Sequence, residues 1–88
     1  MIDVANCPPE VQALKEHADQ LQKKIGQARE RGKVVPFSAP STCANALGCV
    51  AAFVNQPMRQ GRPAVPPTID TVKYIDWGVL DAIRQIAL

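Results

Sequence analysis

The chain has 88 residues, a formal net charge of +2 and an apolar share of 47%. This length makes a single domain, because it leaves no room for a second hydrophobic core. The apolar share excludes disorder throughout the chain. Because its net charge is small, the chain lacks the strong basic bias typical of dedicated nucleic-acid-binding proteins. Small cores often gain stability by association, so we expect a homo-oligomer.

The sequence predicts a cytoplasmic protein that does not associate with membranes. The first ten residues include Asp3 and two prolines, and they lack the basic start of a signal peptide. The longest apolar run, residues 46–54, is about half as long as a membrane-spanning helix. The cysteines, at positions 7, 43 and 49, are odd in number and lack the spacing of a disulfide framework, which fits a reducing compartment.

The first predicted helix covers about residues 8–31. Pro8 and Pro9 suit a first turn, where the missing N–H groups have no partner within the helix, and Gly32 can end the helix. Apolar residues recur at alternating steps of three and four, which is the seam of an amphipathic helix. The seam residues are Val11, Leu14, Ala18, Leu21, Ile25 and Ala28.

Basic residues flank this seam on both sides. The flanking residues are Lys15, Gln22 and Arg29 on one side, and His17, Lys24 and Arg31 on the other. Two copies of the helix would oppose like charges, so we do not expect it to form a coiled coil with itself. Our first interpretation is that the basic flanks pack near Asp70, Asp76 and Asp81 of the third helix. The second is that they bind an acidic partner or a phosphate.

The second predicted helix covers about residues 40–56, with Ser38 or Ser41 as its cap. It has no charged residue, and we therefore predict that it is the innermost helix, buried on several sides. Its expected core face is Leu47, Val50, Ala51 and Val54.

A flank of small residues on this helix suggests a third role, obligate self-assembly. Ala44, Gly48 and Ala52 are spaced four apart, so they share one side of the helix and let another helix approach closely.

The third predicted helix covers about residues 68–87, where apolar residues recur with a period near 3.5. The alternative is a short strand at residues 71–75, because that run is rich in β-branched and aromatic residues. The fold class is therefore all-α. We expect a small three-helix domain with long proline-rich loops at residues 32–39 and 57–67.

The candidate partner-binding residues are Arg59, Arg62, Lys73, Tyr74 and Trp77. Arginine is well shaped to hold a phosphate or carboxylate, and binding residues are frequent in loops such as 57–67. Tyr74 and Trp77 flank the apolar seam of the third helix, and Lys73 can stack on Trp77. Partly exposed aromatic residues near arginine are frequent at the centres of protein interfaces.

An alternative set of residues would bind phosphate. In an oligomer, basic side chains of the first helix and of the second loop could gather around a nucleotide or nucleic acid. The set is Arg59, Arg62, Lys24, Arg29 and Arg31.

Metal binding and catalysis have little support in the sequence. The three cysteines and His17 lack the spacing of zinc modules, and no nucleophile, nucleotide-binding or metalloprotease motif is present. We expect no enzyme activity, no metal and no cofactor. The predicted function is a small binding protein that regulates or inhibits a protein partner. The short chain, its lack of motifs and its long irregular loops would suit an accessory protein of a phage or mobile element.

Overall fold

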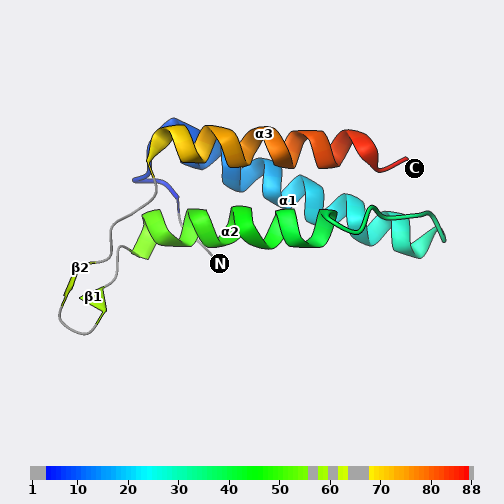
Figure 1. Ribbon diagram of the computed structural model, residues 1–88, viewed down its shortest axis with the longest axis horizontal. Helices are drawn as coiled ribbons and strands as arrows, with labels where there is room; N and C mark the ends of the chain where they lie inside the picture. Colours follow the sequence, from blue (N-terminus) through cyan, green and yellow to red (C-terminus); the bar gives the residue numbers. More distant parts are fainter. Residues whose placement is uncertain (1–3, 56–57, 60–61, 64–67, 88) are drawn as a thin grey trace.

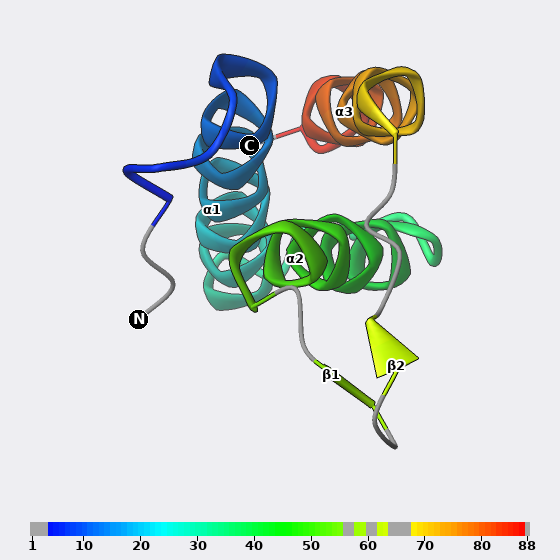
Figure 2. The same cartoon turned by 90° about the vertical axis from the view of Figure 1, so that its left-hand side faces the viewer.

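The computed structural model describes residues 4–55, 58–59, 62–63 and 68–87. Three helices, α1 (Pro9–Glu30), α2 (Ala39–Asn55) and α3 (Ile69–Gln85), form an all-α bundle, which confirms the predicted fold class. α1 and α3 run in the same direction, and α2 runs antiparallel to both (Figure 1). Seen from the end, the helices lie at the corners of a triangle, so each packs against the other two (Figure 2).

α1 forms as its apolar seam predicts. The buried residues of α1 are the six seam residues of the sequence analysis. Leu14 and Leu21 are among the largest fully buried side chains in the protein. The helix ends at Glu30, and Gly32, which directly follows the C-cap residue Arg31, adopts a left-handed φ of 68°. Glycine reaches this conformation without the steric cost of a Cβ atom, and the N–H of Lys33 then donates to the carbonyl oxygen of Ala28 at 2.8 Å.

The prediction that α2 is the innermost helix is wrong. Its buried residues lie on one face, and they are Ala39, Cys43, Ala46, Cys49 and Val50. Ala44 and Gly48 are exposed. A three-helix bundle gives each helix two neighbours, so one side of α2 must face outward. Side chains as small as these leave little apolar surface in water.

The predicted core face of α2 is correct in part. Val50 is fully buried, whereas Leu47, Ala51 and Val54 are only partly buried. The centre of the face therefore lies nearer to Ala46 than the sequence pattern indicates.

α3 is one continuous helix, so the alternative of a strand at residues 71–75 is wrong. The side-chain oxygen of Thr68 caps its first turn by accepting from the N–H of Thr71 at 3.2 Å. Val72, Val79 and Ile86 face the core. This buried seam outweighs the β-strand preference of the run, because packing of an amphipathic face supplies most of a helix's stability.

The loop predicted at residues 57–67 contains a short hairpin. Strands β1 (Met58–Arg59) and β2 (Arg62–Pro63) pair antiparallel, with Met58 opposite Pro63 and Arg59 opposite Arg62. A proline is tolerated here because a two-stranded pair consists of edge strands. The other residues of this loop lie outside the described part of the chain.

α1 and α2 are joined by residues 31–38. No helix within the described residues is both long enough and apolar enough to cross a membrane.

Candidate functional site

The flank of α1 that faces α3 is used for packing. Nζ of Lys24 donates to the carbonyl oxygen of Ile83 at 2.7 Å. Nδ1 of His17 and Oδ1 of Asp76 share a hydrogen bond of 2.6 Å, and both side chains are partly buried. Our first interpretation of the basic flanks therefore holds for His17, whereas Lys24 bonds to the backbone of α3 and not to an aspartate. Lys24, proposed above for phosphate binding, instead connects α1 to the last turn of α3.

The remaining members of the phosphate-binding set do not meet within one chain. Arg29 lies in the last turn of α1 and Arg31 follows directly as its C-cap. Arg59 and Arg62 belong to the hairpin, which lies at the opposite end of the bundle (Figure 1). The molecule is 46 Å long, so a single chain cannot gather these side chains around one phosphate. The side chains of Arg59 and Arg62 lie outside the described residues.

Large aromatic side chains are exposed on α3. Tyr74 is 78% exposed and Trp77 is 64% exposed, and the neighbouring Leu80 is 39% exposed. Lys73 is also exposed on this helix. Several large apolar side chains exposed side by side, as Tyr74, Trp77 and Leu80 are, mark an interaction site more often than a single exposed apolar residue does.

The position of these rings follows from the core seam of α3. Tyr74 and Trp77 each lie two residues from a buried valine, at positions 72 and 79. Two residues turn an α-helix by about 200°, which carries the second side chain to the opposite face. The packing that buries the two valines therefore turns the aromatic rings toward solvent.

A hollow of about 220 Å³ lies beside the rings, between α2 and α3. Its lining residues are Thr42, Asn45, Tyr74, Ile75, Trp77 and Gly78, and we call them the aromatic surface. None of these residues is charged. In the described structure, the Asn45 carboxamide makes no hydrogen bond, so both its donor and its acceptor are open to a ligand. The surface can therefore hold an apolar side chain while Asn45 bonds to a partner's backbone.

Sequence reasoning found two of these six residues, Tyr74 and Trp77. As site residues it missed Ile75 and Gly78, which lie on α3 beside the rings, and Thr42 and Asn45, which join the rings only through the packing of α2 on α3. The one available signal was the polarity of Asn45 in an otherwise small and apolar helix.

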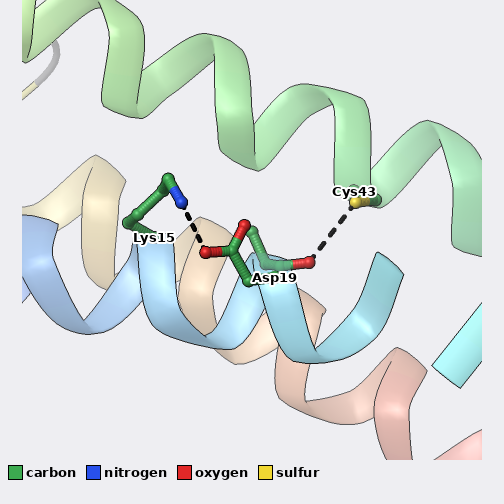
Figure 3. Close-up of polar contacts among 4 residues, drawn as sticks. Lys15, Asp19 and Cys43 are labelled. Atoms are coloured by element: carbon green, nitrogen blue, oxygen red, sulfur yellow. Dashed lines mark hydrogen bonds and ion pairs between the residues drawn. The ribbon is translucent and has the colours of Figure 1, made fainter. Parts of the chain in front are cut away.

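The thiols of α2 are buried and serve packing. Burial raises the pKa of Cys43 and of Cys49, and the nearby Asp19 carboxylate raises that of Cys43 further. Sγ of Cys43 donates to the carbonyl oxygen of Ala18 at 3.5 Å (Figure 3). Within the described part of the chain, no three His, Cys, Asp or Glu side chains are grouped so as to hold a metal ion. A raised pKa disfavours the thiolate, which is the nucleophilic and metal-binding form of cysteine.

Comparison of the chain with protein-family models, curated proteins and solved structures finds no match. Its function is therefore inferred from the chemistry of its own surface.

Proposed function

We propose that the chain is a small non-enzymatic binding protein that regulates or inhibits a protein partner through the aromatic surface. The observation that carries this proposal is the exposure of Tyr74 and Trp77 beside an uncharged hollow. Tryptophan and tyrosine are the side chains most enriched among the residues that dominate binding energy at protein interfaces.

The energetic argument starts from apolar area. Full burial of a large apolar side chain contributes about 1.5–3 kcal/mol, and about 1.4 kcal/mol corresponds to a tenfold change in affinity. A partner that covers Tyr74 and Trp77 gains from both rings. Burial of two of the thiols, those of Cys43 and Cys49, raises their pKa and disfavours the nucleophilic thiolate, which supports a non-enzymatic function.

Site-specific photo-crosslinking tests this proposal in the native host. A benzophenone amino acid placed at position 77 or 74 should give a discrete adduct with one protein. The matched control carries the same group at Glu16, which is exposed on α1 and does not line the hollow beside the rings. Equal adducts from positions 77 and 16 would contradict the proposal. Trp77→Ala should weaken binding of the identified partner by about tenfold or more.

Self-association is a further part of the proposal. The outward side of α2 carries Ala44, Asn45 and Gly48 and has no charge, so a second copy could approach it closely. A Cβ atom at Gly48 would meet nothing within 4 Å, so Gly48→Lys should leave the monomer intact while placing a charge in the contact.

Native mass spectrometry measures the outcome. The wild-type chain should appear as a multiple of the chain mass, and Gly48→Lys should shift it toward the monomer. A wild-type chain that remains monomeric at high concentration would contradict self-association. An added mass that is lost on denaturation would reveal a bound metal or small molecule instead.

A further inference from the structure

A groove follows the junction of α1 and α2 to the loop that joins them. Two hollows, of about 570 Å³ and about 260 Å³, both contact Arg29 and Pro40, so they lie next to each other along this junction. We call the two together the α1–α2 groove. Its outer part is lined by Val35, Pro36 and Phe37, and its inner part by Ile25, Cys43 and Leu47. The lining is therefore mainly apolar.

Positive charge is concentrated at the outer part of this groove. Arg29 and Lys33 line it, and no acidic residue is among its described lining residues. Neither cation forms an ion pair in the described structure. Further along α1, the carboxylate of Asp19 is paired with Lys15 (Figure 3). Glu30 is exposed on α1 and does not line the groove.

Backbone hydrogen bonds hold the loop that forms the outer part. The left-handed Gly32 allows the N–H of Lys33 to reach Ala28, and the N–H of Ala39 donates to the carbonyl oxygen of Pro36 at 3.0 Å. A ligand therefore meets a preformed surface, which lowers the entropy lost on binding.

The rim of the groove exposes large apolar side chains. Phe37 is 100% exposed and Val34 is 85% exposed, the highest values among the large hydrophobic residues described. A phenylalanine this exposed at the rim is available to contact a partner.

We propose that the α1–α2 groove binds an acidic peptide segment of a partner protein, one that carries a large apolar side chain next to aspartate or glutamate. The apolar side chain enters the groove beside Phe37. The carboxylate accepts hydrogen bonds from Arg29 and Lys33, an arrangement in which arginine can donate two parallel bonds. The lining is concave, which suits an inserted side chain better than a flat lipid surface. This site shares no lining residue with the aromatic surface.

Peptide display on the immobilised full chain tests the proposal. Peptides selected from a random library should be enriched in Asp and Glu beside Phe, Leu or Trp. Arg29→Gln, and separately Phe37→Ser, should each weaken binding of the best peptide by about tenfold. The first removes the cation that binds the carboxylate, and the second removes the ring that contacts the apolar side chain. The affinity should also fall as the salt concentration rises.

Two control variants make the result specific. Lys23→Gln removes the same charge as Arg29→Gln from an exposed position on α1 outside the groove lining, and Trp77→Ala alters the aromatic surface. Both should bind the peptide as the wild type does, and circular dichroism should show unchanged helix content in all variants.

Three outcomes would overturn the proposal. The first is a selected set without acidic enrichment, and the second is equal affinity of Arg29→Gln and Lys23→Gln for the best peptide. The third is Phe37-dependent binding to phosphatidylserine vesicles without peptide binding, which would assign the groove to an anionic lipid surface.

Discussion

Cys43 and Cys49 lie inside the bundle, where burial raises the pKa of both thiols above the ordinary value of 9.0. In the unfolded chain each thiol ionises near its ordinary pKa, so the unfolded state loses these protons at lower pH than the folded state does. The stability that the thiols contribute is therefore fully present below about pH 9 and is lost as the pH rises through the folded-state pKa values. We expect the urea midpoint to fall as the pH rises above about 9.

The control is a chain with both residues changed to alanine. Its urea midpoint should fall less over the same range, and the difference between the two chains isolates the contribution of the thiols from that of other groups. Parallel curves for the wild type and the double variant would contradict the assignment of this pH dependence to Cys43 and Cys49.

Exposure of single residues could be predicted where periodicity applied. Tyr74 and Trp77 lie two residues from the buried Val72 and Val79, so helix geometry alone turns them outward. Phe37 follows no period, because it lies in a loop whose path depends on Gly32 and on a turn at Pro36. Its full exposure could therefore be found only in three dimensions.

At the scale of the helices, Lys24 of α1 caps the end of α3. The carbonyl of Ile83 lies in the last turn of α3, where it accepts a 3.4 Å bond from the N–H of the C-cap residue Ile86, and the ammonium group adds a second, shorter bond and offsets the helix dipole. Lys24→Met keeps the aliphatic stem and removes the charge, so it should lower the free energy of unfolding by about 1–2 kcal/mol. Chemical denaturation monitored by circular dichroism measures this loss.

The matched substitution for this experiment is Lys23→Met. Lys23 is exposed on α1 and forms no ion pair in the described structure, so the free energy of unfolding should change by less than about 0.5 kcal/mol. Similar losses for both variants would mean that the contact with Ile83 does not stabilise the bundle.

The three helices could be predicted from the sequence, but their relative burial could not. In α1, long apolar and charged residues alternate clearly, so its seam identified every buried position. In α2, the absence of charge suggested burial on several sides. Ala and Gly are compatible with either environment, and only the number of neighbouring helices decided which side of α2 faces solvent.

At the scale of the whole molecule, one core joins all three helices, and Leu21 is fully buried in it. Leu21→Ala should cost about 2–5 kcal/mol, through lost transfer energy and the cavity left behind. This is a large part of the stability available to a small domain, so the melting temperature should fall sharply and all helices should unfold together. Calorimetry measures both effects. Gln20→Ala, at an exposed neighbouring position, should leave the melting temperature nearly unchanged.

α2 contributes residues to both surfaces, since Asn45 lines the hollow beside Trp77 and Ala44 lines the α1–α2 groove. Within the described residues, its one hydrogen bond to another helix is that from Cys43 to Ala18, and the rest of its attachment is apolar packing. Such a helix has few directional contacts that fix its rotation. We therefore expect a coupling free energy between the two surfaces. A ligand bound to one surface should change the affinity of the other surface for its own ligand. By thermodynamic linkage, the second ligand must change the affinity for the first by the same factor.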